Sequence, residues 1–293
     1  MEQLPYHVPV MLKQVIEGLC IRPSGVYVDC TFGGGGHSRA ILEKLGDDGK
    51  MVVFDQDADA RANIPADPRI LFMPHNFRHI SRFLRLQGIT QVDGLLADLG
   101  ISSYQIDEPS RGFSLRFEGP LDMRMDRRQE LTAQRILETY PEEKLHRIFE
   151  QYGEVTNART LARTILNWRQ HHSLQTIFQL REALRDIVKG NPNRYFAQVF
   201  QALRMEVNDE LGALRELLVQ IPPLLKPGGR VAIITFHSLE DRIVKHTFRE
   251  LQASGVVVIR TKRPIGPGEA EIDRNPRARS AKLRVVERER VAA

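Results

Sequence analysis

Short apolar runs alternate with stretches of helical periodicity along the first hundred residues of the chain. Residues 26–30 (VYVDC) and 51–55 (MVVFD) are two of the runs, and residues 69–73 and 93–98 supply two more. Hydrophobic residues recur at helical spacing between the last two runs, at positions 80–86. Strands that recur with helices between them predict a parallel, doubly wound α/β sheet.

The alternation stops after residue 105. From 106 to 196 the pattern contains helices and loops but no convincing strand, and one helix is opened by a capping box at Thr176 and Gln179. The strand pattern returns at 230–236. The sequence therefore predicts an all-helical insertion in an α/β fold. We expect residues 1–105 and 205–293 to form one domain and residues 106–204 to form the insertion.

The last tenth of the chain carries two more strand-like runs and much of the charge. The runs at 256–260 and 282–287 predict a terminal β-hairpin. Residues 260–290 contain ten Lys or Arg and five Asp or Glu, an excess that equals the net charge of +5 of the whole chain. Basic residues displace counterions from phosphates, so this tail favours a polyanionic partner. A solvated basic face stays open as the plainer interpretation.

The composition is typical of a globular protein. Of the 293 residues, 42% are hydrophobic and 27% are charged, and the length allows two cores. No apolar run approaches the roughly 18 residues of a membrane span, and the N-terminus lacks the apolar core of a signal peptide. Cys20 and Cys30 are too few for a disulfide framework and lack zinc-ligand spacing. We expect a cytoplasmic protein without a membrane segment or a metal.

Four consecutive glycines, Gly33 to Gly36, follow the first predicted strand. An open parallel sheet binds ligands at the carboxyl ends of its strands, and glycine lets the backbone approach a ligand closely. Asp55 ends the second strand, 20 residues after Gly35, where an acid can accept hydrogen bonds from a ribose diol. This arrangement predicts a nucleotide-binding loop that includes Gly35 and Gly36.

Two features favour S-adenosylmethionine over a nicotinamide dinucleotide as the ligand of this loop. Ser38 stands where the dinucleotide fingerprint requires its third glycine. Asp29, at the end of the first strand, suits the positively charged amino-acid end of S-adenosylmethionine and has no role beside a pyrophosphate. A nicotinamide-dependent oxidoreductase remains the alternative.

Asp98 ends the fourth predicted strand and is our candidate catalytic residue. The lone pair of an aromatic amine is delocalised into its ring, so the amine is a poor nucleophile. A carboxylate that accepts hydrogen bonds from the amine helps to direct this lone pair toward a sulfonium methyl group and stabilises the charge that develops on nitrogen. The alternative is that Asp98 only caps a helix.

His237 lies at the end of the strand at 230–236, facing the same crevice, and is a second catalytic candidate that would contact the target base. It has no partners for binding a metal. The neighbouring Ser238 and Asp241 have the spacing of a capping box, so we expect Ser238 to cap the following helix.

Six stretches of the chain, in order, resemble the RsmH family, formerly MraW. They are residues 7–10 (HVPV), 31–38 (TFGGGGHS), 98–103 (DLGISS), 119–126 (GPLDMRMD), 236–242 (FHSLEDR) and 275–280 (NPRARS). The resemblance implies a class I S-adenosylmethionine-dependent methyltransferase, with a Rossmann-like doubly wound sheet, that methylates N4 of a cytidine in the 16S ribosomal RNA of bacteria. We expect the helical insertion at 106–204 to help seat the RNA.

Carried over by position, the cofactor contacts of this family form a set of seven residues. They fall on Gly35, Gly36, His37, Asp55, Phe77, Asp98 and Gln105. His37 and Gln105 rest on the resemblance alone, and His37 would otherwise be taken for an exposed histidine. The resemblance implies 16S ribosomal RNA or the small ribosomal subunit as partner and leaves a homodimer open. A methyltransferase for DNA or another RNA, and a non-catalytic RNA-binding factor, stay open as alternatives.

Overall fold

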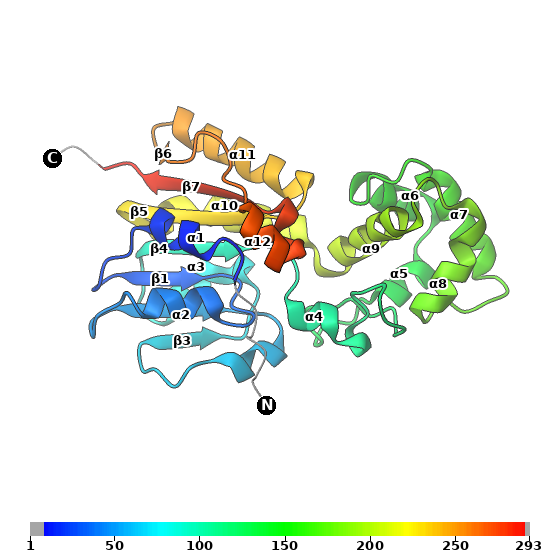
Figure 1. Ribbon diagram of the computed structural model, residues 1–293, viewed down its shortest axis with the longest axis horizontal. Coiled ribbons are helices and arrows are strands. Elements are labelled where there is room, and N and C mark those ends of the chain that lie inside the picture. The colour runs from blue at the N-terminus through cyan, green and yellow to red at the C-terminus, as the bar shows by residue number, and fades with distance from the viewer. Residues whose placement is uncertain (1–8, 291–293) are drawn as a thin grey trace. The chain divides into compact units, whose positions relative to one another are not determined.

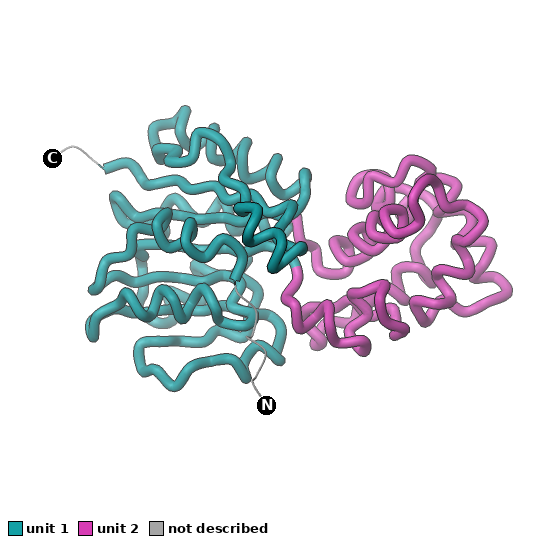
Figure 2. The backbone as a smooth tube through the Cα atoms, viewed as in Figure 1, with its two compact units in different colours: residues 1–100, 212–293 teal, residues 101–211 magenta. Residues whose placement is uncertain are grey.

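The computed structural model describes residues 9–290 (Figure 1). The chain divides into two units, Met1–Gly100 with Gly212–Ala293, and Ile101–Leu211 (Figure 2). The second unit is longer at both ends than the insertion that we predicted at 106–204. Helices α4 (Ser103–Asp107) and α9 (Pro192–Asn208) cross the two predicted limits, and each of these helices stays whole within the second unit.

Seven strands of the first unit form one sheet, in the order β3-β2-β1-β4-β5-β7-β6 (Figure 1). They are β1 (Val26–Asp29), β2 (Lys50–Phe54), β3 (Ile70–Met73), β4 (Val92–Asp98), β5 (Leu225–Thr235), β6 (Val257–Ile259) and β7 (Lys282–Arg288). The pairs from β3 to β5 are all parallel, which confirms the doubly wound prediction. Strand order reverses between β1 and β4, so the ligand-binding edge lies at the carboxyl ends of these strands.

The terminal strands differ from the simple parallel pattern. β7 pairs antiparallel with both β5 and β6, so it lies between them in the sheet. The predicted pairing of the last two strands is confirmed, but their connection is long and contains α12 (Glu269–Arg274) and the 3-10 helix η5 (Pro276–Ser280). β5 also begins earlier than predicted, because residues 226–229 bulge out between the pairs Val92–Leu225 and Gly94–Arg230.

Helices cover both faces of the sheet. They are α1 (Leu12–Leu19), α2 (Gly36–Leu42), α3 (Ile80–Leu86), α10 (Glu210–Leu224) and α11 (Ser238–Ala253), with short 3-10 helices η1 (Ala58–Asn63) and η2 (Phe77–His79). Successive strand residues point to opposite faces, so Leu95 packs with α3, α10 and α11 while Leu96 packs with α1 and α2. Burial on both faces explains why the strands are continuous apolar runs.

The regular elements of the second unit are all helices, and the unit has a core of its own. Besides α4 and α9, it contains η3 (Pro109–Arg111), α5 (Ala133–Thr139), α6 (Glu142–Gln151), α7 (Ala158–Trp168), α8 (Ile177–Leu184) and η4 (Arg185–Ile187). The capping box of Thr176 and Gln179 is confirmed at the start of α8. Between residues 9 and 290, no helix is both long and apolar enough to cross a bilayer.

Candidate functional site

The glycine loop lies between β1 and α2, at the edge where strand order reverses. Gly35 has a φ of 74°, a left-handed conformation that favours glycine, and it precedes the first residue of α2. A Cβ atom at Gly35 would lie 2.8 Å from the ring of Phe32, and one at Gly36 would lie 2.7 Å from Pro9. Both glycines are therefore required by the close approach of neighbouring side chains.

Asp55 connects the glycine loop to the end of β2. One carboxylate oxygen accepts the N–H of Gly33 at 2.7 Å and the other accepts the N–H of Asp57 at 2.8 Å. Burial raises the pKa of Asp55 to about 7, although these two N–H groups act in the opposite direction. A carboxyl group with this pKa gains ionised character when a ligand donates hydrogen bonds to it.

Asp29 is turned into its own loop, contrary to our expectation that it faces the amino-acid end of a ligand. It is 1% exposed, and its carboxylate accepts the N–H of Thr31 at 2.9 Å and the hydroxyl of Ser38 at 2.7 Å. Burial raises the pKa of Asp29, and these hydrogen bonds oppose the increase. In this conformation Asp29 fixes the shape of the glycine loop.

Asp98 does not cap a helix. The next helix, α4, is capped by Ser102, so the capping alternative for Asp98 is wrong. The backbone N–H of Asp98 donates to the Thr31 hydroxyl at 2.7 Å, which ties the end of β4 to the loop after β1. One buried side-chain oxygen, Oδ1, has no hydrogen-bond partner. Burial raises the pKa of Asp98 well above its usual range, and the nearby carboxyl groups of Asp29 and Glu240 raise it further.

His37 is buried, not exposed as its position in the sequence suggested without the family resemblance. Its Nε2 lies 2.9 Å from the carbonyl oxygen of Val10. A carbonyl only accepts, so Nε2 carries the hydrogen and donates, and burial lowers the pKa of the ring. The other nitrogen, Nδ1, lies 3.7 Å from Oδ2 of Asp98. The structure therefore places a neutral imidazole directly beside the candidate catalytic carboxyl group.

Phe77 and Gln105 occupy different settings. Phe77 is half-buried at the start of η2, just after β3, and packs at the margin of the core on the α3 side. Gln105 belongs to the second unit, where its side-chain oxygen accepts the N–H of Ser102 at 3.1 Å and completes the capping box of α4.

His237 caps α11, a role that we had expected for Ser238. Its Nδ1 accepts the N–H of Glu240 at 3.3 Å, and Glu240 in turn accepts the N–H of Phe236 at 2.9 Å. Nε2 of His237 lies 3.2 Å from the other Glu240 oxygen. The capping box therefore begins one residue earlier than predicted, and the buried Nε2 of His237 has no hydrogen-bond partner.

Three residues near the site were not predicted: Thr31, Ser38 and Glu240. Thr31 and Ser38 hydrogen-bond Asp98 and Asp29 respectively, and Glu240 is 3% exposed beside His237. Polar residues that flank a glycine loop were the available signal for the first two. Glu240 carried no such signal, because an acid in the first turn of a helix is common on the surface.

The charges at this edge favour a cationic ligand. The carboxyl group of Asp29 is close enough to raise the pKa of both Asp55 and Asp98. A positive ligand relieves this repulsion, whereas a pyrophosphate increases it. The unpartnered oxygen of Asp98 and the glycine loop therefore fit S-adenosylmethionine, with its positive sulfur and ammonium groups, better than a dinucleotide.

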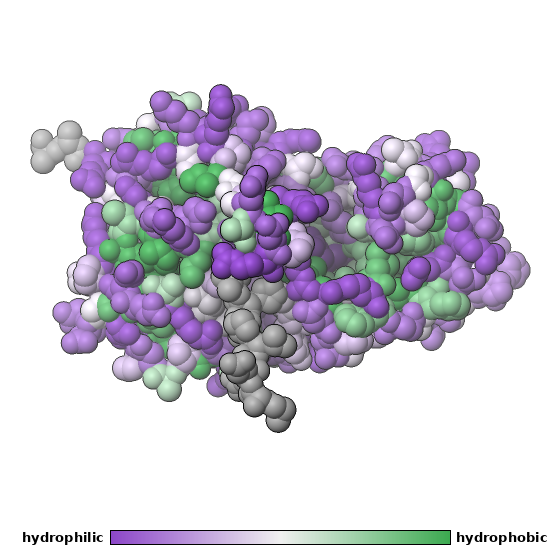
Figure 3. Space-filling model, in the orientation of Figure 1, coloured by the Kyte–Doolittle hydropathy of each residue, from purple (hydrophilic) through white to green (hydrophobic). Residues whose placement is uncertain are grey.

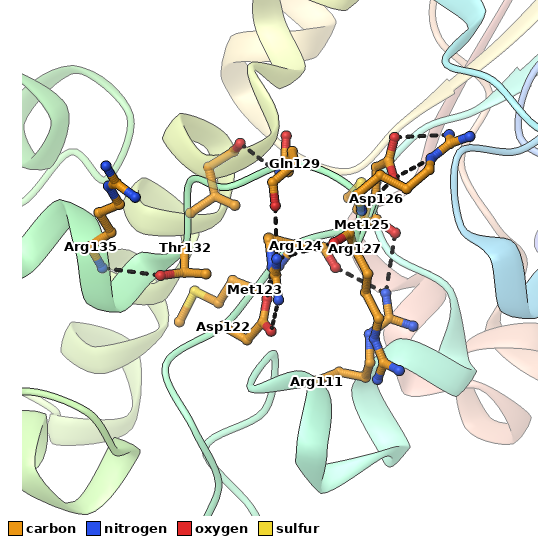
Figure 4. A network of polar contacts seen from close by, with 12 residues as sticks. Arg111, Asp122, Met123, Arg124, Met125, Asp126, Arg127, Gln129, Thr132 and Arg135 are labelled. Atoms are coloured by element: carbon orange, nitrogen blue, oxygen red, sulfur yellow. Dashed lines mark hydrogen bonds and ion pairs between the residues drawn. The ribbon is translucent and has the colours of Figure 1, made fainter.

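Residues 119–126 form a tightly held loop in the second unit (Figure 4). The side chain of Arg111 is 1% exposed and donates to the carbonyl oxygens of Arg124 and Met125. Arg124 pairs with Asp122 at 2.7 Å and donates to the carbonyl oxygen of Gln129 at 2.7 Å. Two arginines thus fix the backbone of a segment that has no regular secondary structure.

The chain matches the MraW methylase family over residues 5–289. Ribosomal RNA small subunit methyltransferase H of Cytophaga hutchinsonii is 51% identical over 298 residues, which cover 97% of this chain and 100% of the relative. The protein of the same name from Bacteroides thetaiotaomicron is 48% identical over 300 residues, which cover 98% and 99%. A solved putative rRNA-methylase from Clostridium thermocellum aligns with a TM-score of 0.48 and 10% identity, over 97% of this chain and 100% of that one.

These matches confirm the resemblance that the six sequence motifs indicated, and the family is one of methylases, not of oxidoreductases. The nicotinamide alternative is therefore not supported. The chain belongs to the MraW methylase family.

Proposed function

We propose that this chain transfers the methyl group of S-adenosylmethionine to the N4 amine of a cytidine in the 16S RNA of the small ribosomal subunit. Membership of the MraW methylase family and the names of the relatives support the ribosomal RNA. The observation that carries the chemistry is the buried, unpartnered oxygen of Asp98 at the carboxyl end of β4. A buried acceptor without a donor is costly, so it is expected to serve a ligand.

The donor would be held along the edge formed by β1, β2 and β4. We assign its binding to Gly35, Gly36, His37, Asp55, Phe77, Asp98 and Gln105. The carboxylate of Asp55 suits a ribose diol, and the half-buried ring of Phe77 suits the face of an adenine. The backbone of Gly35 and Gly36 leaves room for close approach. When bound, S-adenosylmethionine supplies a methyl group that its positive sulfur has already activated, so no metal is required.

Asp98 performs the catalytic step in this proposal. Its raised pKa makes the carboxylate a stronger base than an ordinary aspartate. It accepts a hydrogen bond from the target amine, directs the nitrogen lone pair toward the methyl group, and takes the amine proton as the new bond forms. His37, neutral and 3.7 Å away, adds no competing charge. His237 acts through position, because its capping of α11 fixes Glu240 near Asp98.

The partner in this proposal is 16S ribosomal RNA or the small ribosomal subunit, in the cytoplasm, and the helical unit at 101–211 seats the RNA. The target base must be unstacked to reach a buried carboxyl group, so it is expected to lie in a non-helical or splayed RNA segment.

The test is methyl transfer to small ribosomal subunits from cells that lack this gene. Mass spectrometry should find one methylated cytidine after incubation with wild-type protein and S-adenosylmethionine. Asp98→Asn preserves the shape of the side chain but removes the base, and it should lower turnover by roughly 10²–10⁴-fold.

Asp48→Asn is the matched control, because Asp48 is an exposed carboxylate at the opposite edge of the sheet, just before β2. This variant should retain wild-type turnover. An Asp98→Asn variant with normal turnover would remove Asp98 from the mechanism. A wild-type protein that leaves the subunits unmethylated would overturn the proposed substrate.

A further inference from the structure

A hollow of about 250 Å³ lies between α11 and the segment that follows β6. We name it the α11–β6 hollow. Its lining consists of Asp241, Lys245, Phe248, Arg249, Ile259, Thr261, Lys262, Arg263, Pro264 and Arg284. Of its three apolar residues, Phe248 lies on α11, Ile259 ends β6 and Pro264 lies in the segment after β6, and five of the others are basic. None of these residues belongs to the cluster around Asp98.

Several basic residues of the terminal strands form ion pairs, among them Arg284, which itself lines the hollow. Arg260 pairs with Glu287 at 2.8 Å, and Arg284 pairs with Asp241 at 2.7 Å. Burial alone would raise the pKa of Asp241, but Arg284 and Lys282 outweigh it and hold the pKa below its usual range. Much of the basic tail that the sequence suggested for RNA is therefore used internally.

Four cations of the hollow remain without an ion pair among residues 9–290: Lys245, Arg249, Lys262 and Arg263. Two come from one face of α11, since positions four apart on a helix are neighbours. The other two follow β6. Like charges that converge on a concave surface repel one another, and an anion relieves this repulsion. Hydrophilic side chains also gather over α11 on the face drawn in Figure 3.

The segment that lines the hollow follows the end of β6 that points the same way as the carboxyl end of β4. β6 and β5 point the same way, because each pairs antiparallel with β7. Lys262 and Arg263 therefore follow the carboxyl end of β6, as Asp98 ends β4 at its carboxyl end. Three strand spacings separate β4 from β6 in the sheet, roughly 14 Å at about 4.8 Å each. This distance suits a nucleotide near the target, not the target itself.

We propose that the α11–β6 hollow binds a backbone phosphate of the substrate RNA, beside the nucleotide whose base enters the active site. The inference rests on the proposed function. Lys262 and Arg263, with Lys245 and Arg249 opposite, neutralise the phosphodiester, and the apolar side chains of Phe248 and Ile259 accommodate the adjoining sugar. This site increases the affinity for RNA and fixes the position of the RNA on the protein, but it does not distinguish one base sequence from another, because phosphate contacts carry no sequence information.

The experiment measures the salt dependence of RNA binding. The probe is small-subunit ribosomal RNA isolated from cells that lack this gene, and the variants are Lys262→Ala/Arg263→Ala and Lys245→Ala/Arg249→Ala. Each lost contact to a single-stranded phosphate should reduce the slope of log K against log salt by about 0.7. Because the hollow holds a single phosphate, each double variant should lose about 0.7 from the slope, and its Kd at 0.1 M salt should rise roughly fivefold.

Lys44→Ala/Lys50→Ala is the matched control. Both lysines are exposed in the first unit, and Lys50 begins β2 at the opposite edge of the sheet, so the same charge is removed away from the hollow. This variant should keep the wild-type slope. All variants should bind S-adenosylmethionine with wild-type affinity in calorimetric titrations.

The outcomes separate this inference from the proposed function. Hollow variants with the wild-type slope would overturn the phosphate site, even if methyl transfer to small subunits is intact. Hollow variants that melt earlier with an unchanged slope would assign the four cations to stability instead. Weakened binding of free cytidine monophosphate, without a change in the RNA slope, would indicate a small-molecule site and also overturn the inference. A wild-type protein that neither binds nor methylates the RNA would overturn the proposed function and this inference together.

Discussion

Replacement of Gly35 by alanine tests whether the glycine loop is fixed by its backbone conformation or by its packing. Gly35 and Gly88 both have left-handed φ values, 74° and 70°. A Cβ at Gly35 meets the Phe32 ring at 2.8 Å, whereas a Cβ at Gly88 has nothing within 4 Å. An alanine at either site must adopt the same unfavourable left-handed conformation, but only an alanine at Gly35 meets a neighbouring side chain. Gly88→Ala is therefore the matched control.

Three terms set the magnitude, and the first two cancel between the variants. A left-handed conformation costs a non-glycine residue roughly 1–2 kcal/mol, and alanine recovers about 0.4–1 kcal/mol by restricting the unfolded chain. These terms are common to both variants. Phe32 is 3% exposed and packed in the core on the α1 and α2 side, so moving its ring adds the usual cost of overpacking, about 1–3 kcal/mol. Gly35→Ala should be less stable than Gly88→Ala by this last amount.

The assay is urea unfolding of both variants, together with calorimetric titration of S-adenosylmethionine. Gly88→Ala should bind the donor normally, and Gly35→Ala should bind it at least about tenfold more weakly, because a shifted Phe32 displaces the loop. Phe32→Leu removes the ring atoms that clash, so a double-mutant cycle should show that this change relieves part of the penalty. Equal stabilities for Gly35→Ala and Gly88→Ala, or a cycle with no coupling, would refute the reasoning.

Two further predictions concern the donor site and the second unit. The pKa of Asp55 is raised to about 7 and a ribose diol favours its ionised form, so affinity for S-adenosylmethionine should fall as pH falls below 7, approaching tenfold per unit. In calorimetric titrations below pH 7, the affinity of Asp55→Asn for S-adenosylmethionine should not change with pH. A wild-type affinity that is equally independent of pH would show that Asp55 does not bind the ribose diol. Asn208 is 7% exposed and hydrogen-bonds the backbone of Met123 and Met125 at 2.8 Å each. Asn208→Ala leaves both groups unpaired and should destabilise the second unit by roughly 2–4 kcal/mol, with faster amide exchange at 121–127; unchanged exchange there would show that the arginines alone hold the loop.

Local patterns in the sequence were sufficient to predict most of the elements of this protein. The runs at 26–30, 51–55 and 93–98 became β1, β2 and β4 because a strand buried on both faces must be apolar throughout. The capping box at Thr176 is likewise complete within four residues. Asp55 and Asp98 were identified because an acid at the end of a parallel strand lies at the ligand edge wherever the sheet is placed.

What only the tertiary structure decided depends on residues far apart in the chain. β7 lies antiparallel between β5 and β6, an order that no local periodicity encodes. His37 is buried because the carbonyl oxygen of Val10, 27 positions earlier, accepts its hydrogen bond. The basic tail looked uniform in sequence, but Arg284 pairs with Asp241, 43 positions away, whereas four other cations of the α11–β6 hollow form no ion pair among residues 9–290. The sequence gives the number of charged residues, but the fold decides which of them lie close enough to an opposite charge to form an ion pair.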